Sequence, residues 1–148
     1  MKLSDLKQHQ GLPLTVVAII SGATSQSWSG PFELGKIKTL QDDPPIAVYL
    51  LGNMNNGDFV PGYVGRVGVD GSSKGSLKSR LNGHELEEHF THFKYWKPYN
   101  MYSQSEARLK AAKKEQAIFD LGAKNPGTDR QFIYWEYNEM RPSVPSNT

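Results

Sequence analysis

The sequence predicts a single α+β domain. Three features carry this prediction: two short apolar segments that suit a β-hairpin, an aromatic segment of strand type after them, and a long run of helix formers behind a capping sequence. The 148 residues are enough to bury a core without disulfides or structural metals. The 7 Tyr, 6 Phe and 3 Trp supply bulk for that core.

The composition excludes several kinds of site. The chain has no cysteine, which rules out a disulfide framework, a thiol nucleophile and a cysteine-based zinc site, and which accords with a cytoplasmic location. No two histidines are four residues apart, so their spacing does not favour a zinc site on a helix.

The longest apolar run is "LPLTVVAII" at 12–20. It is too short to cross a membrane, which takes about 20 apolar residues, so we expect no membrane partner. Asp5 and Pro13 favour a strand over a signal peptide for this run.

Basic residues gather in the middle of the chain. The net charge is only +2, but residues 61–124 hold 11 Lys and Arg against 7 Asp and Glu. This excess indicates a polyanionic partner, and ordinary surface lysines are the alternative explanation.

A hairpin is predicted over 46–69. "IAVYLL" at 46–51 is a β-rich run bounded by Pro45 and Gly52. "GNMNNGDFVP" at 52–61 has the composition of a loop, and "GYVGRVGV" at 62–69 predicts the second strand.

A short helix and a third strand follow the hairpin. "SLKSRLNGH" at 76–84 begins with a capping serine and has Gly83 near its end, which is typical of two helical turns. The aromatic segment "FTHFKYWKP" at 90–98 predicts the third strand, which Pro98 closes.

The clearest element is a helix over 103–121. Ser103 and Glu106 have capping-box spacing, and Gly122 stands where a C′ glycine belongs. After it, "QFIYWEY" at 131–137 predicts a strand on a sheet edge, and the last eight residues have the composition of a frayed tail.

Glu115 interrupts the apolar face of this helix. On a wheel of about 100° per residue, Glu115 lies near the centre of the apolar half, whereas Glu106 lies on the opposite side. A carboxylate there is costly unless it is paired or holds a cation. Two interpretations stay open: an ion pair with Arg108, which projects in nearly the same direction, or a metal ligand.

Arg80 and His84 are four residues apart on the predicted helix 76–84 and therefore share a face. A guanidinium beside an imidazole suits phosphate binding and proton transfer. Ordinary surface positions are the alternative for each residue.

Several motifs follow one another in a recognisable order. Two tripeptides on adjacent predicted strands read Ala47-Val48-Tyr49 and Tyr63-Val64-Gly65, although the first keeps only the tyrosine of the usual pattern. After them come Arg80 and His84 in "SRLNGH", then Glu115 in "EQAIFDLG", then Asn125 in "AKNPG". In this order and spacing, residues 46–125 resemble the GIY-YIG nuclease superfamily, and most of all its restriction-endonuclease branch.

The resemblance implies a fold and a domain organisation. It implies a small three-stranded antiparallel sheet flanked by helices, with 46–125 as the catalytic module. Residues 1–45 would then be an N-terminal extension, and 126–148 a C-terminal strand and tail of the same single domain, 1–148.

The resemblance also implies a reaction, which is hydrolysis of DNA phosphodiester bonds by an activated water. Glu115 would hold one Mg²⁺ or Mn²⁺ per active site, and Arg80 would contact a non-bridging phosphate oxygen. A tyrosine would orient or deprotonate the water, with His84 able to take its proton. Gly62 and Gly65 would let a phosphate approach the backbone. The implied catalytic residues are Tyr49, Tyr63, Arg80, His84, Glu115 and Asn125.

Three basic residues are predicted to contact the DNA backbone. Arg66 directly follows the second tripeptide, and Lys94 and Lys97 alternate with aromatics in 90–98. Alternation in a core strand is the other explanation for the aromatics. The expected partner is double-stranded DNA, and cleavage of both strands implies a homodimer or sequential nicking.

The expected function is therefore a sequence-specific DNA endonuclease of restriction type. One alternative keeps the fold and reaction but changes the role to structure-specific repair, or to a mobile-element or phage nuclease. Another is a DNA-binding protein that has lost catalysis.

Overall fold

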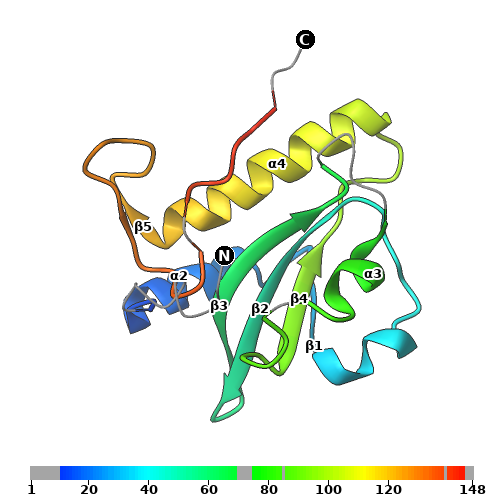
Figure 1. Cartoon of the computed structure of the whole chain (residues 1–148), viewed down its shortest axis with the longest axis horizontal. Coiled ribbons are helices and arrows are strands. Elements are labelled where there is room, and N and C mark those ends of the chain that lie inside the picture. The colour runs from blue at the N-terminus through cyan, green and yellow to red at the C-terminus, as the bar shows by residue number, and fades with distance from the viewer. Residues whose placement is uncertain (1–10, 70–74, 85, 139, 146–148) are drawn as a thin grey trace.

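A four-stranded antiparallel sheet forms the centre of the computed structural model, which describes residues 11–69, 75–84, 86–138 and 140–145 (Figure 1). A second, two-stranded sheet lies apart from it. The strands of the main sheet are, in spatial order, β1 (Ser29–Glu33), β4 (His92–Trp96), β2 (Ala47–Asn55) and β3 (Asp58–Val67), and those of the small sheet are β5 (Ala123–Lys124) and β6 (Phe132–Ile133).

Helices cover both faces of the main sheet. The side chains of one face pack against α2 (Leu14–Ala23) and α4 (Gln104–Leu121). Those of the other face pack against α3 (Leu77–Leu81) and η1 (Leu34–Thr39). The molecule therefore has three layers, and its core is two clusters separated by the sheet.

The α+β class is confirmed, but the expectation of three strands is not. The fourth strand is β1, which comes from the predicted N-terminal extension and pairs with β4 at the edge of the sheet. Its sequence, "SGPFE", contains Gly and Pro and lies mostly exposed. An edge strand of this composition gives little strand signal.

The prediction of a loop over 52–61 is wrong, because β2 and β3 both continue into this segment. β2 reaches Asn55 and β3 begins at Asp58, so only Asn56 and Gly57 form the turn. Their φ angles of 52° and 85° are both positive, as a two-residue hairpin turn of type I′ requires.

The strand predicted at 12–20 is wrong, and the one predicted at 131–137 is present only in part. The run at 12–20 lies mainly in the helix α2, since a short apolar run cannot be told from a buried helix by its period alone. In the segment at 131–137 only Phe132 and Ile133 form a strand. Trp135 and Tyr137 of this segment are buried, whereas Phe132 is exposed. Trp135 donates its indole N–H to the carbonyl of Phe119 at 2.9 Å. Residues 146–148 of the predicted tail lie outside the described ranges.

Both predicted helices after the hairpin are present. Ser103 caps α4 by accepting the N–H of Glu106 at 3.2 Å, and Gly122 ends it, as expected. The other helix, α3, is shorter than predicted: Asn82 caps it, and Gly83, with a φ of 80°, turns the chain. His84 therefore lies beyond the helix and does not share a helical face with Arg80.

None of the helices in the described ranges has both the length and the apolar character that a membrane crossing needs.

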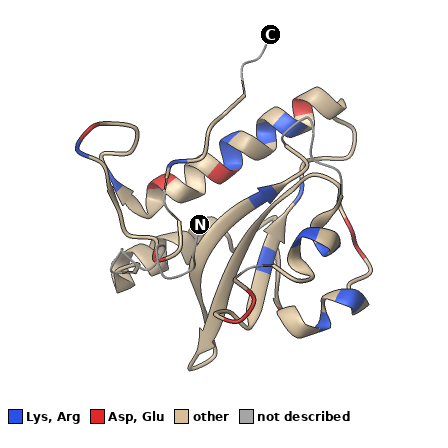
Figure 2. Ribbon diagram, in the orientation of Figure 1, with Lys and Arg blue, Asp and Glu red and all other residues tan. Residues whose placement is uncertain are grey.

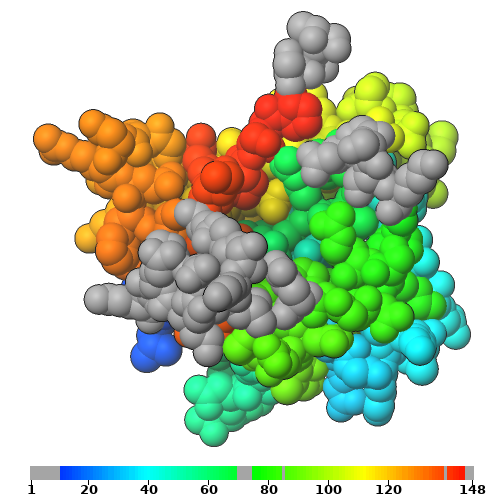
Figure 3. Space-filling view, viewed as in Figure 1, coloured from blue at the N-terminus to red at the C-terminus, as the bar shows by residue number. Residues whose placement is uncertain are grey.

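Residues 138 and 140–145, called the C-terminal segment below, lie against the outer edge of β3 (Figure 3). The buried amide of Asn138 accepts the N–H of Val64 at 3.1 Å and donates to its carbonyl at 2.9 Å, as a neighbouring strand would. Further along, Arg141 forms a two-bonded ion pair with Asp120 of α4 at 2.8 and 2.9 Å. The two Asn138 bonds satisfy backbone groups of Val64 that an open edge strand would leave unpaired, and the Arg141–Asp120 pair fixes the segment to α4.

Gly65 lies directly under the ring of Tyr49. The two residues are paired across β2 and β3, and a Cβ at position 65 would be 2.5 Å from both Cζ and Oη of Tyr49. A Cβ at Gly62 would be equally close to the ring of Phe90. Both glycines therefore make room for aromatic rings, which differs from the phosphate approach expected from the sequence.

We expect Gly65→Ala to destabilise the protein by about 1–3 kcal/mol, because the methyl group overpacks a buried ring. Gly22→Ala in α2 is the matched control, since a Cβ there has no neighbour within 4 Å. Urea unfolding of both variants measures the difference. Equal stability of Gly65→Ala and the wild type would contradict this account of the packing.

Candidate active site

Three rings form the centre of the site on the α3 side of the sheet. Strand register pairs Tyr49 with Gly65 and Leu51 with Tyr63, so the two tyrosines are diagonal neighbours. Their ring centroids are 6.2 Å apart, and that of His84 lies 5.8 Å from Tyr49 and 5.5 Å from Tyr63. The sequence prediction that these three residues meet is consistent with this geometry.

The hydrogen bonds of His84 define its tautomer. The backbone N–H of Leu86 donates to Nδ1 at 3.1 Å, so Nδ1 carries no proton and the imidazole proton lies on Nε2. Nε2 is 3.0 Å from Oη of Tyr49 and therefore donates to it. In this arrangement His84 does not take a proton from Tyr49, which differs from the role that the resemblance implied.

Arg80 reaches the same hydroxyl from α3. Its guanidinium attracts the Tyr49 oxygen by charge and by a hydrogen bond, and its Nη1 donates to the carbonyl of Arg66 at 3.1 Å. The helix that carries Arg80 is held by Asp43, whose carboxylate accepts the Ser76 hydroxyl at 2.8 Å and the Lys78 N–H at 2.9 Å. No motif in the sequence pointed to Asp43.

Burial raises the pKa of Tyr49 well above 10, and the neighbouring Tyr63 raises it further. Arg80 acts in the opposite direction, whereas the negative charge of Glu115 adds to the rise. Burial prevails, so Tyr49 keeps its proton at neutral pH.

Glu115 is buried, as the helical wheel predicted, with 5% of its surface exposed. Its ion-pair partner is Arg66, whose Nε lies 3.3 Å from Oε1, and not Arg108, the partner proposed from the sequence. Arg66 is itself mostly buried and also donates to the carbonyl of Ser143 in the C-terminal segment.

The phenols and the Glu115 carboxylate lie on opposite faces of β3. Side chains alternate along a strand, so Tyr63 and Gly65 face α3 while Val64 and Arg66 face α4. Arg66 joins the two sides, because its side chain contacts Glu115 and its carbonyl accepts Arg80.

The sequence predicted a divalent cation at Glu115, and this one carboxylate would give such an ion few protein ligands. Mg²⁺ commonly binds one or two carboxylates and keeps several waters. The described residues contain no group of three or more His, Asp and Glu side chains that could hold a metal. A cation at Glu115 would share the carboxylate with Arg66. The other carboxylate considered, Glu106, is exposed at the start of α4.

Asn125 is not brought to this cluster. It lies in the exposed turn after β5 with a φ of 49°, and its carbonyl accepts the Thr128 hydroxyl at 2.8 Å. In Figure 1 this turn projects at the opposite end of the molecule from α3. The asparagine that lies beside β3, the strand of Tyr63, is Asn138. Its position directly after the alternating aromatics of 131–137 was the signal in the sequence that could have identified it.

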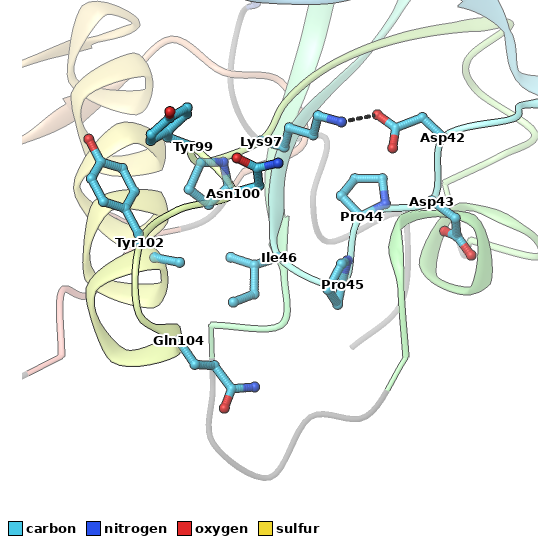
Figure 4. A pocket seen from close by; sticks show the side chains of 12 residues that line it. Asp42, Asp43, Pro44, Pro45, Ile46, Lys97, Tyr99, Asn100, Tyr102 and Gln104 are labelled. Atoms are coloured by element: carbon cyan, nitrogen blue, oxygen red, sulfur yellow. Dashed lines mark ion pairs between the residues drawn. The ribbon is translucent and has the colours of Figure 1, made fainter.

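The predicted DNA contacts Lys94, in β4, and Lys97, directly after it, have partners inside the chain. Lys94 donates to the carbonyl and hydroxyl of Thr24 at 2.9 and 3.0 Å, and burial lowers the pKa of its amine. Lys97 forms an ion pair with Asp42 at 2.9 Å, and both residues line a pocket of about 530 Å³ (Figure 4). Asp42 also accepts the hydroxyl of Tyr95 at 2.8 Å.

Tyrosine ionisation provides a first test. Burial and the bond to Asp42 raise the pKa of Tyr95 to about 12, and that of Tyr49 lies well above 10. Raised tyrosine pKa values stabilise the fold fully below the unfolded value of about 10, and this stability is lost as pH rises beyond it. We expect the phenolate absorbance of Tyr49→Phe to match that of the wild type up to about pH 10. An ionisation at neutral pH that disappears in Tyr49→Phe would contradict this.

The Arg66–Glu115 pair provides a second test. We expect Arg66→Met to cost about 3 kcal/mol, because it leaves a buried carboxylate without its guanidinium. The double variant Arg66→Met/Glu115→Gln should recover part of this loss, since it removes the buried charge as well. Urea unfolding of the two single variants and the double variant completes the cycle. Strictly additive losses would show that the two side chains do not interact.

Comparison of the chain with models of known protein families, with curated proteins and with solved structures finds no match.

Proposed function

We propose that the chain is a metal-dependent endonuclease of the GIY-YIG type that hydrolyses phosphodiester bonds of double-stranded DNA, with sequence-specific restriction as its role. The observation that carries the proposal is the grouping of Tyr49, Tyr63, His84 and Arg80 at the strand edge where Arg66 meets Glu115.

Arg80 is the best placed group to stabilise the transition state. Phosphodiester hydrolysis accumulates negative charge on the phosphoryl oxygens, and a fixed guanidinium lowers its energy. Arg80 is exposed on α3, where the Arg66 carbonyl accepts from its Nη1 and the Tyr49 hydroxyl is a second acceptor. A guanidinium has five N–H donors in a fixed fork, which suits it to bind a non-bridging oxygen from this position.

The two tyrosines differ in exposure, and this supports different roles. Tyr63 is partly exposed, so we assign to it the contact with the attacking water. Tyr49 has only 1% of its surface exposed and accepts hydrogen bonds from His84 and Arg80, so we assign it a positioning role. Phenols have pKa values of about 10, so orienting the water is a better use of Tyr63 than deprotonating it.

Glu115 would hold the single Mg²⁺ or Mn²⁺ of the site. When bound, such an ion polarises the phosphoryl oxygen and stabilises the leaving 3′-oxygen. Arg66 balances the charge of the buried carboxylate. Arg66 therefore serves Glu115 rather than DNA in this scheme, and Asn125 has no role in it because it lies in the exposed turn after β5.

One such site cuts one strand, so for cleavage of both strands we propose either a homodimer or sequential nicking. The lack of cysteine supports a cytoplasmic setting for the reaction.

The Arg66–Glu115 pair also favours a second candidate, a DNA-binding protein without catalysis. A guanidinium 3.3 Å from the carboxylate competes with a cation for the same oxygens. Such a protein would retain DNA but leave it intact.

We expect Glu115→Gln to abolish Mg²⁺-dependent cleavage of plasmid and phage DNA while DNA binding is largely kept. The glutamine keeps the shape of the side chain but provides a much weaker metal ligand. Glu106→Gln is the matched control, since it removes an exposed carboxylate of the same helix and should cut as the wild type does. Gel analysis with Mg²⁺ and with EDTA measures both activities.

The products distinguish the candidates. Discrete bands support restriction, a smear indicates a nuclease without sequence preference, and a retarded but intact substrate indicates the binding protein. Full cleavage by Glu115→Gln would refute the assignment of the metal ligand.

A further inference from the structure

We infer that a lysine-rich groove beside α4 binds the DNA backbone at a distance from the scissile phosphate. The groove has a volume of about 610 Å³ and lies between α4, the end of β4 and the segment before β1. It is called the lysine groove below, and it is lined by Ser27, Trp96, Lys97, Tyr99, Tyr102, Lys110, Lys113, Lys114 and Ala117.

The charge of the groove is of one sign. Four lysines line it, and no carboxylate occurs among its described lining residues. Figure 2 shows basic residues along α4. Lys97 is held by Asp42 in the adjoining pocket, so Lys110, Lys113 and Lys114 carry the unbalanced charge. A concave surface lined by one sign of charge attracts a polyanion.

Aromatic rings hold two of these lysines in position. The ammonium of Lys110 lies 4.9 Å from the ring centre of Tyr102, and that of Lys114 lies 4.9 Å from the ring centre of Trp96. Each contact contributes about 0.5–1 kcal/mol at an exposed site and limits the freedom of a flexible side chain. The lysines also cover the ring faces, so the groove suits phosphate contacts better than base stacking.

The spacing of the lysines suits a nucleic acid strand. Lys110 and Lys114 lie about 6 Å apart along the helix axis at 1.5 Å per residue. Phosphates of one DNA strand follow at about 3.4 Å along the duplex axis, so this stripe can face two or three of them. Ala117 continues the stripe with a small side chain that leaves the groove open.

The lysine groove and the tyrosine cluster lie on different sides of the sheet. Trp96 and α4 belong to one core cluster, whereas Tyr49 and Tyr63 belong to the other. The groove therefore lies apart from the tyrosine cluster, and Glu115 is buried in α4 and is not among the residues that line the groove. This inference rests on the proposed DNA substrate, but it does not need cleavage.

The test compares two variants that each lose three positive charges. The groove variant, Lys110→Gln/Lys113→Gln/Lys114→Gln, removes three positive charges from the groove. The control variant, Lys36→Gln/Lys38→Gln/Lys124→Gln, removes three exposed lysines elsewhere. Binding of a fluorescent DNA duplex is measured in EDTA over a range of salt concentrations. Single-turnover cleavage is measured separately with Mg²⁺ at saturating protein.

We expect the groove variant to bind DNA about ten-fold or more weakly. The slope of its log binding constant against log salt concentration should become shallower by roughly two to three, which corresponds to two or three fewer released counterions. The control variant should stay close to the wild type in both DNA affinity and salt dependence. The cleavage rate at saturation should be unchanged in the groove variant, because the lysines do not touch the reacting phosphate. Circular dichroism verifies that both variants fold.

Three results would overturn the inference. Equal weakening by both variants would mean that only net charge matters, and competition by polyglutamate as strong as by DNA would mean a site for acidic proteins. A wild type that does not bind DNA would reject the groove and the proposed function together. A wild type that binds DNA through the groove but never cleaves it would reject only the nuclease.

Discussion

The contact between the Tyr49 ring and the backbone of Gly65 is the constraint on which the rest of the site depends. Because any side chain at position 65 would collide with the ring, β2 and β3 can pack this way only with glycine there. The same register places Tyr63 diagonally from Tyr49, so both phenols face α3. Arg80 and His84 then converge on one buried hydroxyl. A shift of one residue would turn the phenols to opposite faces.

The position of β3 at the sheet edge allows the Arg66–Glu115 pair to connect with the tyrosine side of the site. Tyr63 and Arg66 point to opposite faces, and in a central strand they could not contribute to one centre. At the edge, the Arg66 carbonyl is available to Arg80 while its side chain reaches Glu115. An open edge would invite pairing with other chains, and the amide of Asn138 prevents this at Val64. The C-terminal segment therefore both protects the strand and holds Arg66.

The sequence predicted best where the local chemistry decides the outcome. Ser103 and Gly122 set the ends of α4, and the helical period placed Glu115 in the core. The prediction failed where tertiary contacts decide. β1 gains its strand conformation from β4, and the run at 12–20 becomes a helix that packs on the sheet. The partner of Glu115 could not be predicted either, because Arg108 is close in the helix whereas Arg66 arrives from another element.

The hydrogen bonds around Tyr49 indicate how such a site would work. His84 is a donor to Tyr49, since the Leu86 N–H occupies its other nitrogen, and Arg80 is a second donor. Burial nevertheless keeps the phenol protonated. The cluster is therefore not a relay that removes protons from the phenol. It is a rigid support that fixes Arg80 at the protein surface, where a developing negative charge can meet it. In a site of this kind, stabilisation of charge on the phosphate contributes more than proton abstraction. In the proposed enzyme, the single buried carboxylate would contribute by holding the cation that the phosphate also contacts.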